Sequence, residues 1–540
     1  MIVKVYSIIP SGFSGALVEV EGDKNHGLPA FNIVGMANKT VNEARDRVRS
    51  ALTNSGFSFP IDKITVNLAP ADLHKDGTYL DLPIALSVLL ISEQLVYTDV
   101  KDRIFVGELS LEGSLRPVHG IINIVETAKR LGYKEVFLPS DNLEQASLVK
   151  GIKLIGVNNL TELLLILKNQ AIPTPLAQNV VKKKNTPRRS QSFLDEIKDQ
   201  AIAKRALSIA VAGHHNILIS GPPGAGKTLL ARTAADLLPD LTAEEQIPLT
   251  KLYSLISTDC GIITSRPFRT PHHSASSISI LGGGSVLTPG EISLAHLGVL
   301  FLDEMPEYPR TVLESLRQPL EDRQITLARA KSRTTFPADF MLIATMNPCP
   351  CGFYGDETHE CTCSAAQIKN YQKKISGPLL DRIDLLITVQ KVSTDSLTVP
   401  GSKPAKTARK TRNTAKNSLP STPEIALQHP EHDIVKNKIF EAILRQRRRY
   451  GSDCISNSSL SSADIVRLLK IESEAESLLR SAAERLDLSA RSFYKTIKVA
   501  QTIADFEASD SIKPAHISEA LSYRLDQTGN RLIIQGKPLS

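Results

Sequence analysis

Residues 216–228 read NILISGPPGAGKT, and this stretch decides the fold of the central part of the chain. An apolar strand leads into a glycine-rich turn, and the segment LLARTAADLL that follows is typical of a helix. The turn matches the pattern G-x-x-x-x-G-K-[ST], in which glycines let backbone amides converge on phosphate oxygens without a clashing Cβ atom. The pattern predicts a nucleoside triphosphate site formed by Gly221, Pro222, Pro223, Gly224, Ala225, Gly226, Lys227 and Thr228.

Two carboxylates follow a second apolar strand in the segment GVLFLDE at 298–304. We expect Lys227 to reach the β- and γ-phosphates of ATP, and Thr228 and Asp303 to hold Mg²⁺. Glu304 is then placed to orient and polarise the attacking water. The sequence therefore predicts an enzyme that hydrolyses ATP, rather than a protein that only binds it.

The composition is that of an ordinary globular chain. A length of 540 residues allows roughly three or four domains. The net charge of +7 permits acidic partners without demanding them, and the lack of Trp disfavours extensive base-stacking platforms. The start of the chain lacks the features of a signal peptide, and the longest apolar run, 84–91, is too short to span a membrane. We expect a cytoplasmic protein with no membrane contact.

Four of the six cysteines are gathered at Cys349, Cys351, Cys361 and Cys363. Thiols this close in sequence can converge on one tetrahedral Zn²⁺, although C-x-C is a less usual ligand spacing than C-x-x-C. We favour a structural zinc site here. Free buried cysteines or a redox pair are the alternatives, and His359 is an alternative ligand.

The segment FLDEIKDQAIAKRAL at 193–207, together with the phosphate-binding turn, resembles the start of an AAA+ ATPase motor. The strand FMLIATMNP at 340–348 ends in Asn347, which resembles the sensor 1 residue that hydrogen-bonds the γ-phosphate or the attacking water. The string SGPLLDRIDL carries Arg382 in a setting that resembles an arginine finger, which stabilises transition-state charge at the neighbouring subunit's site. A salt bridge to Asp381 or Asp384 is the alternative for this arginine.

Arg491 lies near the start of an amphipathic helix at 488–507 and resembles sensor 2. The resemblance implies that Arg491 contacts the nucleotide and reports its state through a helical lid. The segment 323–345 reads as one strand, a turn rich in Arg and Lys, and a second strand entering Asn347. It resembles the hairpin that replicative-helicase relatives project into a ring channel. Contacts with DNA phosphates are then implied for Arg329, Lys331 and Arg333, and a solvated basic turn is the alternative.

The first part of the chain resembles the Lon-protease-like domain that precedes such motors, through HKDGTYLDLPIAL at 74–86 and the segment 107–142. Lon-type proteases activate a serine with a lysine. Here Tyr79 stands near the expected serine, and Ile121-Ile122 occupy the place of the lysine. A relocated pair is disfavoured because such dyads need fixed geometry. We expect a scaffold or partner-binding domain without peptidase activity.

Several motifs in the right order closely resemble the YifB/ComM family of magnesium-chelatase-like AAA+ proteins. They are the segment 266–297, NPCPCG, SGPLLDRIDL and the amino-terminal domain, and the likeness covers 1–390 and 430–528. It implies a hexameric ring and, for ComM-type members, a DNA helicase that promotes branch migration during recombination of incoming DNA. Two departures are Asp199, where glycine is usual, and the low-complexity basic insertion at 393–424.

We therefore expect an α/β fold: an AAA+ P-loop core with a helical lid, preceded by a Lon-protease-like α+β domain. The expected divisions are a non-proteolytic domain at 1–168, a basic linker at 169–191, the ATPase core at 192–392, a disordered basic insertion at 393–424, the lid at 425–528 and a tail at 529–540. The predicted function is an ATP-driven, homo-hexameric motor acting on branched, single- or double-stranded DNA, with a protein partner at the amino-terminal domain. The alternatives are a chelatase-like remodeller of a protein and a nucleotide-gated scaffold, which the acidic pair and Arg382 disfavour.

Overall fold

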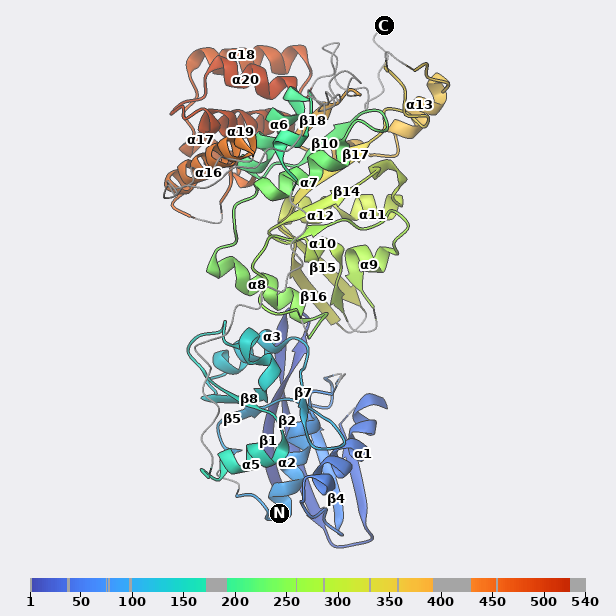
Figure 1. Ribbon diagram of the computed structural model, residues 1–540, viewed down its shortest axis with the longest axis vertical. Coiled ribbons are helices and arrows are strands. Elements are labelled where there is room, and N and C mark those ends of the chain that lie inside the picture. The colour runs from blue at the N-terminus through green and yellow to red at the C-terminus, as the bar shows by residue number, and fades with distance from the viewer. Residues whose placement is uncertain are drawn as a thin grey trace, which may run out of the picture.

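The computed structural model describes residues 2–35, 39–73, 75, 78–96, 100–170, 192–258, 260–284, 287–329, 332–356, 359–391, 429–452 and 455–524. Figure 1 shows an elongated molecule in which the amino-terminal part, drawn in blue and teal, forms one end. The part that begins at residue 192 forms the other end, with the carboxy-terminal helices, in orange and red, gathered beside it. No helix in the described part of the chain is long and apolar enough to cross a membrane.

A seven-stranded mixed sheet organises the amino-terminal part, in the strand order β3-β4-β2-β1-β5-β8-β9. Its strands are β1 (Ile2–Ser11), β2 (Ser14–Asn25), β3 (Ala30–Val34), β4 (Lys63–Ala69), β5 (Arg103–Phe105), β8 (Glu135–Pro139) and β9 (Lys153–Val157). A separate short pair is β6 (Glu108–Leu109) and β7 (Leu115–Arg116). The helices are α1 (Lys39–Asn54), α2 (Asp81–Ile91), α3 (Ile121–Arg130), α4 (Leu143–Ala146) and α5 (Leu160–Leu167). All residues of α2 are buried, so the apolar run at 84–91 belongs to a helix inside the amino-terminal core.

A five-stranded parallel sheet organises the central part, in the order β11-β14-β17-β10-β18. Its strands are β10 (Ile217–Ser220), β11 (Phe268–Arg269), β14 (Val299–Leu302), β17 (Met341–Met346) and β18 (Leu385–Thr388). The three middle strands are apolar and fully buried, as expected for parallel strands covered on both faces. The predicted α/β fold with a parallel sheet is thus confirmed for this part.

Helices surround this sheet and continue into the carboxy-terminal part. Around the sheet are α6 (Ala201–Gly213), α7 (Lys227–Leu237), α8 (Ala243–Ser254), α9 (Ser277–Leu281), α10 (Glu291–Leu294), α11 (Arg310–Ser315), α12 (Arg317–Asp322), α13 (Ala365–Gln372) and α14 (Gly377–Leu380). The carboxy-terminal helices are α16 (Pro430–Tyr450), α17 (Ser462–Leu468), α18 (Ser473–Arg485), α19 (Ala490–Phe506) and α20 (Pro514–Ser522). The helices predicted from 430 onward are confirmed, and they share one hydrophobic core with α6, α7 and β10.

Two hairpins project from the central part: β12 (Gly282–Gly283) with β13 (Thr288–Pro289), and β15 (Gln324–Arg329) with β16 (Ser332–Pro337). The sequence interpretation, in which the strand after the basic turn runs into Asn347, is wrong. β16 stops at Pro337, and the separate strand β17 enters Asn347 from a different sheet. Proline has no amide hydrogen for a ladder, so the pairing ends there and the chain is free to turn.

The amino-terminal and central parts touch directly. The ring of Phe13, in the β1–β2 turn, meets Phe336 of β16 edge-on at 6.3 Å between centroids. The Lys251 ammonium lies 4.3 Å from the centre of the Phe13 ring and pairs with Glu126 of α3. The Gly120 amide donates to the Ser254 carbonyl at 2.7 Å. These contacts connect the amino-terminal part to the β15–β16 hairpin and to α8.

Candidate functional site

The carboxyl ends of three parallel strands bring the predicted nucleotide-site residues together. β10 leads into the phosphate-binding turn, β14 into Asp303 and β17 into Asn347. Neighbouring parallel strands end at the same edge of a sheet, and these three are neighbours in the order β14-β17-β10. Turn, acidic pair and amide therefore meet at what we call the carboxyl edge.

Lys227 begins α7, the helix that follows the turn, and its ammonium group faces back across the turn. It donates to the carbonyls of Gly221 at 2.5 Å and Pro222 at 3.0 Å, and to the Asn347 side-chain oxygen at 2.9 Å. Burial lowers the pKa of Lys227, and the nearby carboxylates of Asp303 and Glu304 act in the opposite direction. A lysine ammonium beside a glycine-rich turn that leads into a helix fits a phosphate ligand.

Asp303 and Thr228 form the oxygen-rich corner of this edge. The Thr228 hydroxyl donates to one Asp303 oxygen at 3.3 Å, and the Thr345 hydroxyl donates to the other at 2.5 Å. A hydroxyl beside a carboxylate is the donor set that Mg²⁺ prefers, so the residues present fit this ion. Glu304, exposed and with a positive φ of 51°, has its amide bonded to the Thr345 hydroxyl. That bond fixes the backbone from which the Glu304 carboxylate projects.

Arg382 and Arg491 lie at the opposite, amino edge of the sheet, in a cavity of about 500 Å³. Both arginines bind one carboxylate, that of Glu321 in α12: Arg382 at 2.7 Å and Arg491 through a shorter contact. Arg382 also donates to the Pro378 carbonyl at 2.6 Å and the Arg317 carbonyl at 3.2 Å. Neither Asp381 nor Asp384, the partners weighed from the sequence, forms an ion pair with Arg382 among the described residues.

Asn216 and Asp384 hold the backbone of the amino edge. The Asn216 amide donates to Asp384 at 2.9 Å, and the Asn216 side chain donates to the Arg382 carbonyl at 3.2 Å and accepts from the Leu342 amide at 2.9 Å. Burial opposes the ionisation of Asp384, but Lys495 and His215 outweigh it and hold the pKa of Asp384 well below its ordinary range. The arginine-bearing segment is therefore anchored to the first residues of three strands.

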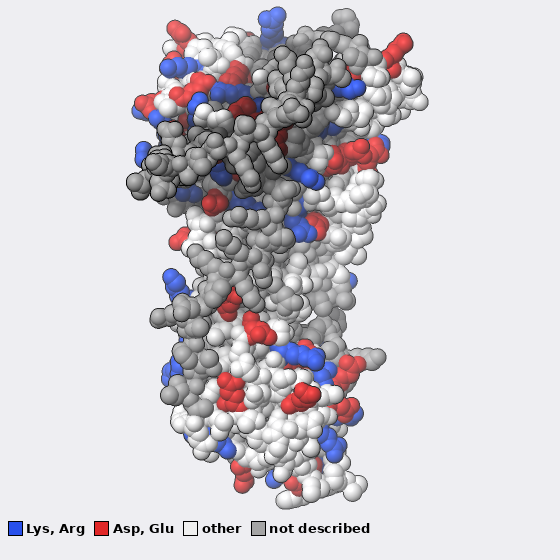
Figure 2. All heavy atoms as spheres, in the orientation of Figure 1, with Lys and Arg blue, Asp and Glu red and all other residues white. Residues whose placement is uncertain are grey.

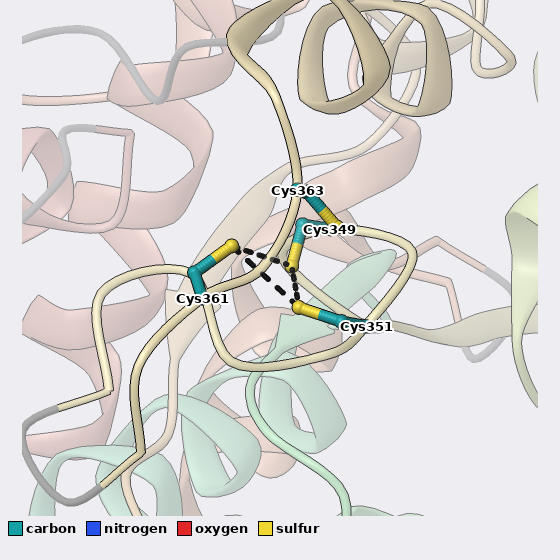
Figure 3. A group of neighbouring side chains, drawn as sticks. All are labelled: Cys349, Cys351, Cys361 and Cys363. Atoms are coloured by element: carbon teal, nitrogen blue, oxygen red, sulfur yellow. Dashed lines mark hydrogen bonds between the residues drawn. The ribbon is translucent and has the colours of Figure 1, made fainter.

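The four predicted cysteines converge, as Figure 3 shows. Their sulfur atoms all lie within 4.8 Å of one another, and no other group of this kind was found in the described part of the chain. Cys349 lies 3.3 Å from Cys351 and 3.7 Å from Cys361, and the last two are 3.5 Å apart, far beyond a disulfide bond of about 2.05 Å. Tetrahedral Zn–S bonds of about 2.3 Å put sulfur atoms about 3.8 Å apart, so the cluster fits one metal ion.

Two of the three predicted DNA-contacting residues lie on the β15–β16 hairpin, close to its turn. Arg329 and Arg333 are exposed on its two strands, and Lys331 lies outside the described residues. Figure 2 shows acidic and basic side chains interspersed over one face of the molecule. On that face the described residues form no extended field of a single sign.

The two segments that carry the amino-terminal resemblance also meet. The Gly107 amide donates to the Tyr79 carbonyl at 3.2 Å, and a cavity of about 290 Å³ opens between Thr78, Tyr79 and the run Arg116–His119. Ser87, in α2, donates to the carbonyl of Ile84 in the same helix at 2.7 Å. The cavity is lined by Tyr79, the residue that stands near the position of the expected serine.

Three residues of the two edges were missed by sequence reasoning: Glu321, Thr345 and Asn216. Asn216 carried a faint signal, because it is a polar residue directly before an apolar strand. Thr345 is a lone hydroxyl in a buried strand next to the acidic pair. Glu321 had no signal, since its two partners are 61 and 170 residues away.

Models of known families match most of the chain. The magnesium chelatase subunit ChlI model covers residues 193–397, a second model, subunit ChlI of Mg-chelatase, covers 20–142, and the ChlI C-terminal model covers 431–524. With the nucleotide-site geometry, these matches define a magnesium-chelatase-like AAA+ protein, a class that indicates ATPase activity with ATP and Mg²⁺ as ligands.

Curated relatives match over nearly full length. Competence protein ComM of Haemophilus influenzae is 41% identical over 524 residues, covering 96% of this chain and 97% of the relative. Uncharacterized protein YifB of Escherichia coli is 40% identical over 516 residues, 95% of each chain, and YifB of Salmonella typhimurium is 39% identical over 520 residues, again 95% of each. The chain belongs to the YifB/ComM family of magnesium-chelatase-like proteins.

Proposed function

We propose that the protein is a homo-hexameric, ATP-driven motor that moves along DNA and promotes branch migration in homologous recombination or natural transformation. The observation that carries this proposal is the separation of the two edges: the nucleotide-site residues gather at one edge of the sheet, and the arginines expected to serve a nucleotide lie at the other. In a ring where each amino edge meets the next subunit's carboxyl edge, the arginines of one subunit lie beside the nucleotide site of the next.

At the carboxyl edge the backbone of 221–226 cradles the phosphates, and Lys227 moves its ammonium from the turn carbonyls to the β- and γ-phosphates. Thr228 and Asp303 hold Mg²⁺, which neutralises phosphate charge when bound. Glu304 accepts a hydrogen bond from the attacking water and aligns it. Asn347, already bonded to Lys227, is within reach of the γ-phosphate or that water.

At the amino edge Arg382 acts as the finger for the neighbouring subunit's nucleotide, where it offsets charge that develops on the γ-phosphoryl group. Arg491 binds the same nucleotide as sensor 2. Their shared partner, Glu321, supports this pairing of roles, because one carboxylate holds both arginines at one place. Assembly then exchanges Glu321 for phosphate oxygens.

The β15–β16 hairpin supplies the DNA contact. Arg329, Lys331 and Arg333 bind phosphates along the ring axis, which gives affinity that falls steeply with salt and shows little sequence preference. The printed name of the Haemophilus influenzae relative, a competence protein, supports DNA as the polymer. The alternative function is the remodelling of a protein partner. The match to the magnesium chelatase model supports this alternative.

We further propose that Cys349, Cys351, Cys361 and Cys363 hold a structural Zn²⁺, supported by sulfur spacings that fit a tetrahedral ion. Protein purified without added zinc should contain close to one zinc per chain. Less than about a tenth of an equivalent, with four thiols titratable in the native protein, would rule the site out.

Residues 1–168 are proposed to form a Lon-protease-like, non-proteolytic domain that docks a protein partner, and the whole protein to act in the cytoplasm. The packing of α3 against α8, and of Phe13 in the β1–β2 turn against Phe336, supports a scaffold role. A serine-reactive probe should leave this domain unlabelled with or without ATP.

One experiment tests the motor proposal most directly: ATP turnover measured with no nucleic acid, with single strands, with duplex and with a four-way junction. We expect turnover to rise with DNA and most with the junction. A rate that is the same in all four conditions would replace the DNA motor by the protein-remodelling alternative.

A further inference from the structure

The cysteine loop, which we define as residues 347–364, presses directly on the phosphate-binding turn. Gly352 has a φ of +88°, and a Cβ atom at this position would lie 2.8 Å from Cδ of Pro223. That separation is shorter than any real Cβ contact, and a proline ring has no rotamer by which to withdraw. The two loops therefore touch with no room for one more carbon atom.

The same loop joins the nucleotide site through its first residue. Asn347 accepts a hydrogen bond from Lys227 at 2.9 Å, and Cys349 follows two residues later, fully buried. Within the loop, the Tyr354 amide donates to the Cys349 sulfur at 3.3 Å, and the Gly352 amide donates to the Cys349 carbonyl at 3.0 Å. The thiol cluster thus lies between two contacts with the nucleotide site, one at Asn347 and one at Gly352.

Turns, a stacked pair of rings (Phe353 and His359) and the sulfur cluster give the described part of this loop its shape. Its described residues contain no helix or strand, and α13 begins only at Ala365. A segment without ladder hydrogen bonds takes its conformation from whatever cross-links it, and a bound metal ion is such a cross-link. The position of Gly352 against Pro223 consequently depends on the four sulfur atoms being held together.

We propose that the metal ion in the cysteine cluster sets the shape of the phosphate-binding turn, so that affinity for ATP depends on metal occupancy. This inference rests on the zinc site and the nucleotide site proposed above. It makes Gly352 a positioning residue, which acts on the nucleotide through Pro223. Loss of the metal lets the loop move, and the turn then loses its support from that side.

Two glycines of the loop provide a matched pair of variants. Gly352 and Gly355 both have positive φ, +88° and +79°, so alanine strains the backbone equally at each. Only at Gly352 does the new methyl group meet the turn, since nothing lies within 4 Å at Gly355. Binding is measured by titrating a fluorescent ATP analogue with Mg²⁺ in the absence of DNA, and zinc content by elemental analysis.

We expect Gly352→Ala to keep one zinc per chain and to bind the analogue at least about tenfold more weakly, the equivalent of about one hydrogen bond. Gly355→Ala should bind as the wild type does. Equal affinities for the two variants would overturn the proposal, because backbone strain alone would then explain any change.

Metal removal tests the link between the cysteine cluster and ATP affinity in the wild-type protein. Wild-type protein stripped of zinc by a chelator should lose affinity for the analogue by a similar factor and regain it when Zn²⁺ is returned. The double variant Cys361→Ser/Cys363→Ser should remain in the weak state with or without Zn²⁺. Unchanged affinity after stripping, or no zinc in the protein at all, would overturn the inference. Stimulation of turnover by DNA is a separate readout, so a failure of the motor proposal is distinguishable from a failure here.

Discussion

The two edges of the parallel sheet are built in opposite ways. At the carboxyl edge, Asp303 and Glu304 are exposed, and the Asp303 carboxylate accepts hydrogen bonds from the neutral hydroxyls of Thr228 and Thr345. At the amino edge the cations Arg382 and Arg491 are already bound to Glu321. The carboxyl edge thus has exposed carboxylates that are able to bind a ligand. At the amino edge, Glu321 neutralises the charge of the two arginines, and a ligand must replace it. The difference supports the proposal that the site is completed between subunits.

The largest effect is expected from Arg382→Ala, which should reduce ATP turnover by about 10³-fold or more, because an arginine finger stabilises charge in the transition state. Mixing this variant with Glu304→Gln, itself inactive, should restore roughly a quarter of the interfaces, since each pairing of an intact carboxyl edge with an intact finger is active. Turnover of the mixture is the measurement. If the mixture of the two variants stays inactive, Arg382 does not act at the nucleotide site of a neighbouring subunit. Arg491→Ala should follow the same pattern with a smaller loss.

Glu304→Gln alone should lower turnover by about 10² or more and leave ATP affinity unchanged, because activation of water is lost while the Mg²⁺ corner stays intact. Glu307→Gln is the control: it lies three residues away, and its carboxylate forms a surface ion pair with Lys374. Steady-state kinetics and ATP titration decide between them. If both variants lose equal activity, the role belongs to the acidic surface and not to Glu304.

Variants of the β15–β16 hairpin test whether DNA binds at this hairpin. Replacing Arg329, Lys331 and Arg333 by alanine should remove stimulation of turnover by DNA and lower the salt slope by about one unit per lost phosphate contact. Basal turnover and ring assembly should persist. The control replaces Arg467 and Arg480, exposed cations of α17 and α18. Normal junction migration by the triple variant would place the DNA elsewhere.

The smallest effect concerns the fall of the free energy of unfolding in acid, which we expect to depend on His296 near the amino edge. Burial lowers the pKa of His296 to about 4, and the Asp339 carboxylate acts against this shift. Between pH 6.5 and 4 the unfolded chain takes up a proton that the folded chain refuses, so the free energy of unfolding falls as pH falls, by at most about 1.4 kcal/mol per pH unit.

Urea denaturation midpoints at pH 7.5 and 5 should therefore differ more for the wild type than for His296→Gln. The variant lacks the titrating group, and its glutamine can still accept the Asp339 amide that His296 binds at 3.1 Å. Identical shifts in the two proteins would assign the acid sensitivity to other groups.

The sequence predicted most of the carboxyl edge because its residues are encoded locally. The phosphate-binding turn, the acidic pair and Asn347 each end a strand, and parallel strands that are neighbours bring such ends together without further information. The four cysteines were likewise predicted to converge, since they lie within one short segment. Roles for all these residues remain proposals, but their gathering could be read from the pattern.

The amino edge and the loop contacts could not be predicted in this way. Glu321 meets Arg491 only because the carboxy-terminal helices pack beside α12, a contact that no periodicity encodes. The close approach of Gly352 to Pro223 depends on how two loops fold over each other. The split of the expected strand at Pro337 was visible in principle, because proline cannot donate to a ladder.

Strand β17 has a mechanical consequence. It is the middle strand of the sheet, paired with β10 over residues 343–346 and with β14 over residues 341–344, and all its residues are buried. Its six residues span about 20 Å between the segment that leaves the β15–β16 hairpin and Asn347 at the carboxyl edge. A strand clamped on both sides neither stretches nor buckles, so it behaves as a strut. In a motor of the proposed kind a strut transmits a fixed stride, whereas an elastic link would shorten each step under load.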